Sequence, residues 1–212
     1  MDLDSIAETL EHMQESRDAI LGGSRRVIGL CSRAIMSVHG GGVDEAAQML
    51  EEARPLLEGM RSCAHPRTAQ HLIPAEQEYV EASALLAVVR GGEIPGIDRL
   101  GVMPESYVLG LLDMVGELKR LMLDHMRAGR TGPALSVFDT MDELYGRLYR
   151  FAAYDKILKE SRRKLDVCRM VLETSRSAIT EEVRRQDMVR AASGHGAGSG
   201  PHTIQSGAGD GI

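Results

Sequence analysis

The stretch that decides the fold is ESYVLGLLDMVGELKRLMLDH, residues 105–125. Its apolar side chains recur at alternating steps of three and four residues, at Val108, Leu111, Val115, Leu118 and Met122. This spacing is typical of one face of an amphipathic α-helix. Proline is favoured as the first residue of a helix, so the preceding Pro104 marks the start. We therefore expect a helix over Pro104–Met126.

Glycine and proline divide the rest of the chain into further helical segments, and no segment has the period of two that indicates a strand. The other expected helices run from Asp4-Ser5 to Gly40, over 44–61, from His65-Pro66 to Val89, over 133–153 and over 155–190. The sequence therefore predicts an all-α fold, a bundle of about six long antiparallel helices. This domain is expected to span residues 1–192, and the Gly/Ser-rich residues 193–212 are expected to form a disordered tail.

The composition agrees with a helical core. The 212-residue chain is 43% hydrophobic but contains two Phe, five Tyr and no Trp. Leu, Ile, Val, Ala and the 12 Met must therefore fill the core, which favours helices over sheets. The last helix has an apolar seam from Leu158 to Val183, and long helices of this kind often leave surface for another subunit. We expect a homo-oligomer.

Charge and cysteine usage limit the functional classes. The net charge of −6 does not attract phosphate backbones, so nucleic-acid binding would need local basic patches or bound cations. The three cysteines lie far apart without a CxxC pair, which is typical of reduced thiols. The acidic N-terminus has no apolar signal region, and no apolar run approaches about 18 residues. We expect a cytoplasmic protein with no membrane contact.

The segment AEQEYVEASALLAVV, residues 75–89, carries the first pair of candidate acids. Glu78 and Glu81 occupy neighbouring positions on one helix face, where they repel unless something positive lies between them. A helical wheel puts Glu81 on the side of Leu85 and Val88, and burying an ionised carboxylate is costly unless it is paired or bound to a metal. The alternative is that these acids mark the solvated N-terminal end of the helix, where acids suit the helix dipole.

The stretch 105–125 carries a second pair, Asp113 and Glu117, on the face opposite its apolar stripe. On pattern alone this is a solvated polar face. Gly110 and Gly116, however, weaken a helix by roughly 1 kcal/mol each, and small residues beside acids permit close approach of another helix or a ligand. Metal sites in helix bundles are built from carboxylates on facing helices, and two helices with two carboxylates each can supply such ligands. All-oxygen ligation suits Mg²⁺ or Mn²⁺.

Three blocks of the chain resemble the translin superfamily, particularly its translin-associated factor X branch. They are SRDAILGGSRRVIGLCSRAIMSVH (16–39), QEYVEA (77–82) and YVLGLLDMVGELKRLML (107–123). A weaker fourth block is RRKLDVCRMVLETSR (162–176). With the order of the helices, the resemblance covers about residues 10–190.

The resemblance implies a bundle of long helices that assembles into a hollow, usually octameric, shell and binds single-stranded nucleic acid. In the factor X branch, carboxylates on the inner surface cleave RNA with Mg²⁺, whereas the translin branch binds without the full acidic set. Carried over residue by residue, these acids are Glu78, Glu81 and Asp113, and Glu117 matches an additional acidic position. Because all four are present, the resemblance implies the nuclease branch.

The chain departs from the family in two features. The connection between the third and fourth helices is short where eukaryotic members carry a longer insertion. The aromatic platforms and basic runs that would indicate single-strand binding are nearly absent. Arg67, Lys119 and Arg120 are the cationic residues nearest the acids in sequence, which makes them the candidate phosphate contacts. As solvated side chains they need no function.

Other polar residues have simpler interpretations. The seven histidines show no zinc spacing, and no Walker loop is present. His39 beside Gly40 is expected to cap a helix end, and Cys31 and Cys168 to be core thiols. The run RRK at 162–164 is expected on a solvated face.

Three hypotheses follow. The first is an Mg²⁺-dependent endoribonuclease (with Mn²⁺ as a substitute) that acts on single-stranded RNA from a homo-oligomeric shell. Glu78, Glu81 and Asp113 would hold the ion, with Glu117 as ligand or water-orienting base. The second is a non-catalytic shell that binds single-stranded RNA or DNA. The third is a helical scaffold with no nucleic-acid role.

Overall fold

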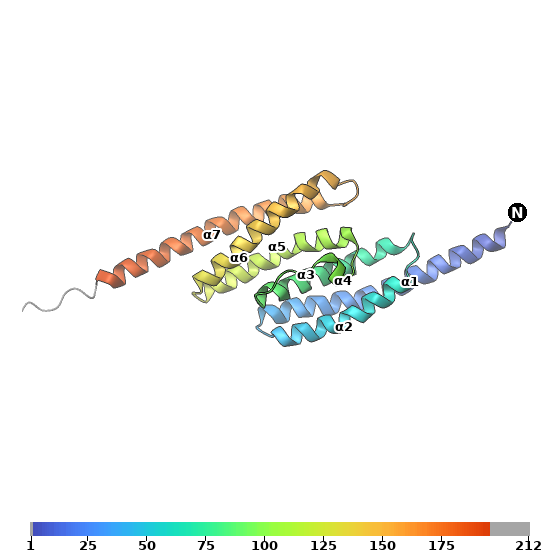
Figure 1. Cartoon of the computed structure of the whole chain (residues 1–212), viewed down its shortest axis with the longest axis horizontal. Coiled ribbons are helices and arrows are strands. Elements are labelled where there is room, and N and C mark those ends of the chain that lie inside the picture. The colour runs from blue at the N-terminus through green and yellow to red at the C-terminus, as the bar shows by residue number, and fades with distance from the viewer. Residues whose placement is uncertain (1, 196–212) are drawn as a thin grey trace, which may run out of the picture.

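The computed structural model describes residues 2–195, and every regular element in this range is a helix (Figure 1). No strand occurs there, so the all-α prediction is confirmed. The long helices in this range are α1 (Leu3–His39), α2 (Val43–Ser62), α3 (Ile73–Val89), α5 (Pro104–Arg127), α6 (Thr131–Leu148) and α7 (Ser161–His195). Short elements lie between them: the 3₁₀ turn η1 (Ala69–Leu72), the one-turn α4 (Ile97–Leu100) and the 3₁₀ turn η2 (Tyr149–Tyr154).

Helix α1 begins earlier than the sequence predicted. The carboxylate of Asp2 accepts a hydrogen bond from the backbone N–H of Ser5 at 3.2 Å, so Asp2 is the N-cap in place of Asp4 or Ser5. The helix ends at Gly40 as expected, and Gly41 follows with a φ of 87°, a conformation that glycine adopts without strain.

The third helix begins later than predicted, because buried polar contacts hold the preceding connection against α1. The hydroxyl of Ser16 accepts from the backbone N–H of His65 at 3.0 Å and lies 2.8 Å from the hydroxyl of Thr68. The chain therefore passes through a turn and η1 before α3 starts at Ile73.

The junction of the last two helices is also longer than predicted. Helix α6 ends at Leu148, and η2 follows where the sequence predicted helix to residue 153. The carboxylate of Asp155, the expected first residue of the last helix, instead accepts from the backbone N–H of Arg162 at 3.1 Å. This bond satisfies an N–H group in the first turn of α7, which has no partner within the helix.

The bundle consists of two antiparallel three-helix units, α1–α2–α3 and α5–α6–α7 (Figure 1). The units pack through α3 and α5, with α1 against α3 on one side and α7 against α5 on the other. The connection 90–103 returns across the bundle, so α3 and α5 run in the same direction (Figure 1). Within the expected antiparallel bundle, this one pairing is parallel, and it places the first halves of α3 and α5 side by side.

The core is aliphatic and rich in methionine, as the composition predicted. Its largest fully buried side chains include Ile20, Leu57, Leu85, Met114, Leu118, Met122 and Met141. The second half of α3 is buried around most of its circumference, which confirms the prediction from its continuous apolar run. Cys31 and Cys168 are buried free thiols, also as predicted.

Gly110 allows α3 and α5 to approach closely. A Cβ atom there would lie 2.6 Å from the carbonyl oxygen of Gln77 and 2.8 Å from the Cβ of Val80. Such distances are shorter than packed atoms tolerate, so only glycine fits this position. The expectation of close helix approach is confirmed for Gly110. Gly116 has no such neighbour within 4 Å.

The bundle is elongated, and the ends of two helices extend beyond it. The N-terminal part of α1 projects at one end and the C-terminal part of α7 at the other (Figure 1). Because α7 continues to His195, the first three residues of the expected tail are helical, and the remainder, 196–212, lies outside the described residues. None of the helices in residues 2–195 is long and apolar enough to cross a membrane.

Candidate carboxylate site

The candidate site lies where α3 and α5 pair, and it brings together the four acids that the sequence singled out. Glu78 and Glu81 come from α3, and Asp113 and Glu117 from α5. Both glutamates of α3 are close enough to Asp113 and Glu117 for their mutual repulsion to raise the pKa values of Glu78 and Glu81. The parallel direction of the helices aligns the two pairs.

Glu81 has the most perturbed carboxyl group of the four. Burial raises the pKa of Glu81 to about 8, with further increases from the charges of Asp113, Glu78 and Glu117. The pKa of Glu78 is raised for the same first two reasons, burial and then Asp113, and a hydrogen bond from Ser32 on α1 opposes this. These acids are therefore not the solvated end of a helix; they are partly buried and short of positive charge.

Asp113 has a cationic partner on another helix. The ammonium of Lys164, near the start of α7, donates to Oδ1 of Asp113. The lysine side chain is 18% exposed, and its charge also lowers the pKa values of Glu78 and Glu81. The prediction that the run 162–164 lies on a solvated face is therefore wrong for Lys164.

Glu117 is held by a buried histidine. Nε2 of His39 lies 2.6 Å from Oε2 of Glu117, and the histidine side chain is only 3% exposed. This hydrogen bond is the main reason that the pKa of Glu117 is lowered. Nδ1 of the same ring lies 3.6 Å from Asp124. His39 is at the end of α1, as expected, but its side chain reaches across to α5 rather than only capping its own helix.

Glu76, the remaining acid of this segment, belongs to a separate structural contact. It is fully buried, and its two oxygens accept from Nε of Arg61 at 2.8 Å and from the backbone N–H of Met103 at 2.9 Å. These bonds tie α2 and the end of the 90–103 connection to α3. Glu76 is therefore paired on both oxygens, unlike Glu78 and Glu81.

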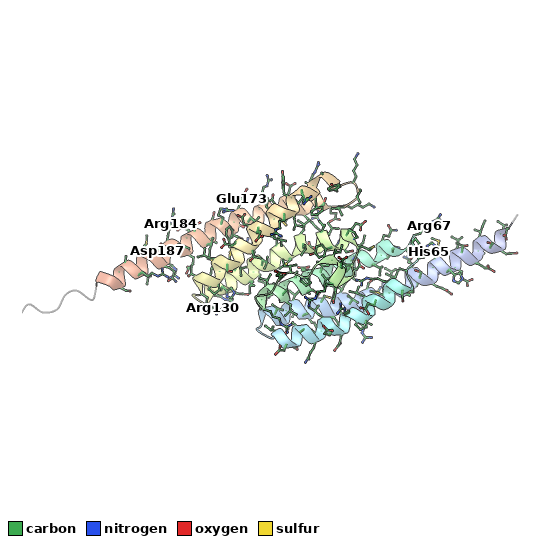
Figure 2. All side chains as sticks on the ribbon, in the orientation of Figure 1. His65, Arg67, Arg130, Glu173, Arg184 and Asp187 are labelled. Atoms are coloured by element: carbon green, nitrogen blue, oxygen red, sulfur yellow. The ribbon has the colours of Figure 1, made fainter. Side chains whose placement is uncertain are left out.

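The three predicted phosphate contacts lie at different distances from the acids. Arg120 is next to the site, with Nη1 3.8 Å from Oε2 of Glu117. The ammonium of Lys119 donates to the hydroxyl of Thr174 on α7 at 2.8 Å. Arg67 is exposed in the connection before α3, where Figure 2 shows it with His65, and among the described residues no ion pair joins it to the four acids. The structure thus brings Arg120 to the site and leaves Arg67 apart.

The pattern alone predicted that the polar face of α5 is solvated. In the structure, part of this face is buried. Ser106 and Gly110 are buried on this face, and Asp113 and Glu117 are only partly exposed. The face packs on α3 and so carries its acids into the bundle. Of the two glycines that pointed to this in the sequence, only Gly110 lies at the contact with α3, and Gly116 is exposed.

The four carboxylates form a site for positive charge, with oxygen donors that suit a hard divalent cation. In residues 2–195, no three histidine, cysteine, aspartate or glutamate side chains are arranged as a ready set of metal ligands. The unbalanced negative charge around Glu81 and the lysine already drawn to Asp113 both fit a cation at this place. Side chains would have to rearrange from these positions for the acids to share one ion.

Sequence reasoning missed His39 and Lys164 as members of the site. Each contacts an acid far away in the chain, and neither stands in a pattern that reveals its partner. The sequence indicated such partners only indirectly: four acids on two facing helices require cationic side chains from the flanking helices to neutralise them.

Three comparisons with known proteins agree with this architecture. The model of the Translin family matches residues 65–175, which include all four acids. An uncharacterised protein of Methanocaldococcus jannaschii is 30% identical to this chain over 181 residues, which make up 84% of this chain and 81% of that protein.

Solved structures with the same fold include AfC3PO, whose TM-score with this chain is 0.80. It has been solved alone, at 30% identity, and in a complex with duplex RNA, at 29% identity; in both cases the match covers 87% of this chain and 98% of the AfC3PO chain. The structure of apo-NeC3PO has a TM-score of 0.75 at 24% identity, over 85% of this chain and 97% of that one, and it is a likeness of fold alone.

Proposed function

Because the chain belongs to the translin family, as its sequence and fold both confirm, we propose that it is a metal-dependent endoribonuclease acting on single-stranded RNA. Glu78, Glu81, Asp113 and Glu117 are its proposed catalytic carboxylates. The family resemblance of these four positions, which implies the nuclease branch, supports this assignment.

The observation that carries the proposal is the convergence of four acids from two helices in a partly buried place. Burial and repulsion from the neighbouring acids raise the pKa of Glu81 to about 8, so the ionised side chain destabilises the native chain. A bound cation would offset this cost. Perturbed carboxyl groups of this kind cluster at functional sites, although structural networks also produce them. Here the buried structural acid, Glu76, is paired separately, which leaves the four acids for another role.

The proposed ligand is Mg²⁺, for which Mn²⁺ can substitute, held by Glu78, Glu81 and Asp113. When bound, such an ion supplies positive charge that stabilises the phosphate as it is attacked and makes water a better nucleophile. Glu117 is either a fourth ligand or the base that orients the attacking water. His39 holds Glu117 ionised and fixed in direction, which either role requires.

RNA binding is proposed on two grounds. AfC3PO, which has the same fold, was solved with duplex RNA, so RNA is a ligand of a structural relative. Arg120 lies on α5 beside Glu117, where phosphate oxygens would meet it, and Lys119 is the adjacent residue, whose ammonium donates to Thr174 of α7. We also propose that the chain acts as a homo-oligomeric shell, for which the family resemblance implies an octamer.

Cleavage of a labelled single-stranded RNA tests the proposal. Wild-type protein is expected to cut with Mg²⁺ or Mn²⁺ and to stop with EDTA, and Glu81→Gln is expected to lower the rate by about 100-fold or more. Glu173→Gln is the matched control, because Glu173 is exposed on α7 away from the bundle interior (Figure 2). EDTA-sensitive cleavage at the wild-type rate in Glu81→Gln would place the chemistry elsewhere.

Binding of single-stranded RNA or DNA without cleavage is the second candidate function. The ion pair of Lys164 with Asp113 favours it, because a lysine that neutralises an acid permanently leaves fewer ligands for a metal. Gel-shift titration separates the two candidates. A binding protein retains intact RNA with Mg²⁺ present, and its affinity falls as salt rises.

A further inference from the structure

Lys164 is the cation most closely associated with the proposed metal ligands. It lies in the first turns of α7, and its ammonium donates to Oδ1 of Asp113. Its side chain is 18% exposed, so most of it is shielded from water between α5 and α7. The lysine is thus part of the carboxylate site rather than of the protein surface.

The charge of Lys164 acts on more than its direct partner. It opposes the repulsion that the other acids exert on both Glu78 and Glu81. The neighbouring cations have other partners: Arg163 pairs with Glu160 at 2.6 Å, Lys119 donates to Thr174, and Arg120 lies 3.8 Å from Glu117. Lys164 therefore serves the three acids that are the proposed metal ligands.

One positive charge does not balance these acids. Of the three proposed ligands Glu78, Glu81 and Asp113, only Asp113 has a cationic partner among the ion pairs of residues 2–195, and that partner is Lys164. A divalent cation would balance the site better, but it would have to approach Asp113, where the ammonium already lies. Two cations within a few ångströms repel strongly in a partly buried site. The lysine and a divalent ion therefore compete for the same place.

On the premise of the proposed function, we propose that Lys164 is the resident counter-ion of the carboxylate site in the metal-free chain, and that a divalent cation binds by displacing its ammonium from Asp113. The lysine stabilises the empty site and lowers its affinity for metal. Its long side chain allows the ammonium to swing away without movement of α7.

Replacing Lys164 then has two opposite effects. Lys164→Met removes the competitor, so the affinity for Mn²⁺ is expected to rise at least about tenfold. The same change removes the counter-ion, so the variant is expected to unfold at a lower temperature than the wild type in EDTA and to gain more from added Mn²⁺. A lysine that only braces α7 against α5 predicts no gain in metal affinity.

Isothermal titration of the full chain with Mn²⁺ at a pH of about 8, where protons no longer saturate Glu81, measures the affinity directly. Lys159→Met is the matched control, because Lys159 is an exposed lysine just before α7 and its loss changes the net charge equally. Lys164→Arg, which keeps the charge, is expected to bind Mn²⁺ as the wild type does. Circular dichroism and thermal unfolding establish that each variant is folded, and Lys164→Gln replaces Lys164→Met if that variant is not.

The outcomes separate this inference from the proposed function. Tighter binding in Lys164→Met but not in Lys159→Met, abolished by a second change Asp113→Asn, supports both. If Lys164→Met binds Mn²⁺ no more tightly than the wild type, the displacement is overturned. The metal site itself is still supported in that case if the wild type binds Mn²⁺ and the single variant Asp113→Asn does not. Absence of Mn²⁺ binding in the wild type and in every folded variant overturns both.

Discussion

Glu76 and Glu81 lie on the same helix, and their surroundings give them different roles. Glu76 is fully buried but has Arg61 and the N–H of Met103 as partners, so its charge is satisfied within the fold. Glu81 is partly buried among other acids, so its charge is opposed. A buried carboxylate with partners stabilises an arrangement of helices, whereas one among like charges is available to a ligand.

Arg61→Met is expected to destabilise the protein by about 3–5 kcal/mol, because it leaves the buried charge of Glu76 without its partner. Urea unfolding followed by circular dichroism measures the loss. The double variant Arg61→Met, Glu76→Leu is expected to recover much of it, since apolar replacement of both partners is often neutral. A loss in the single variant no greater than that of the exposed Arg67→Met would contradict the structural role of the pair.

The raised pKa of Glu81 predicts how stability depends on pH when metal is absent. Between its usual unfolded value, about 4.3, and about 8, the native chain holds a proton on Glu81 that the unfolded chain has released. The contribution of this group to stability is therefore full below that window and is lost as the pH rises through it. In Glu81→Gln the loss disappears.

Urea unfolding in EDTA at several pH values tests this. The stability of Glu81→Gln relative to the wild type is expected to increase by about 1–3 kcal/mol between pH values near 5 and near 8. Taking the difference between variants removes the opposite effect of Glu117, whose pKa is lowered. A difference that stays constant over this range would show that Glu81 is not perturbed.

At the scale of elements, the pairing of α3 with α5 determines the site. A simple hairpin would make α5 antiparallel to α3. Connection 90–103 instead returns across the bundle before α5 begins, so the two acid-bearing helices run parallel (Figure 1). Gly110, which precedes Asp113 by one helical turn, then lets α5 approach the backbone of α3 at Gln77. The distance between the two pairs of acids depends on this contact.

Gly110→Ala is expected to cost about 1–3 kcal/mol, because the new methyl group would force α5 away from α3. Cleavage of RNA is expected to fall with it, since Asp113 moves away from Glu81. Gly116→Ala is the control on the same helix; with open space around it, the change is expected to stabilise by about 0.5–1 kcal/mol. Thermal and urea unfolding of both variants measure the contrast, and equal effects would contradict the close packing at Gly110.

At the scale of the whole molecule, the helix ends outside the bundle are the surfaces that the chain does not cover itself. The projecting part of α1 exposes Leu3, Ile6 and Leu10 at 59%, 55% and 58%, and their spacing puts them on one stripe. Exposed apolar stripes of this kind mark interaction surfaces. They agree with the expectation that the chain forms a homo-oligomer.

Ile6→Glu with Leu10→Glu is expected to reduce the size of the oligomer, because two charges would be placed in the apolar stripe. Size-exclusion chromatography with light scattering gives the mass. The control, Ser5→Glu with His12→Glu, adds the same charges on the other side of α1. If both double variants keep the mass of the wild type, α1 is not the surface of self-association.

The sequence by itself determined the helices and the family, because helix formation is local and a period of three to four residues is visible in any window of the chain. It also identified the four acids, through the resemblance of QEYVEA and LGLLDMVGEL to the family, and the aliphatic core. Helix ends were less accurate where a distant side chain fixed them, as Ser16 does before α3.

Only the tertiary structure decided which charges balance the acids. His39 contacts Glu117 across 78 residues and Lys164 contacts Asp113 across 51, and no local pattern carries such a pairing. The same holds for the glycines of α5, where Gly110 meets a neighbouring backbone and Gly116 meets open space. Electrostatic and steric partners depend on how helices pack, and the direction of α5 against α3 is set by a connection whose course the sequence pattern does not reveal.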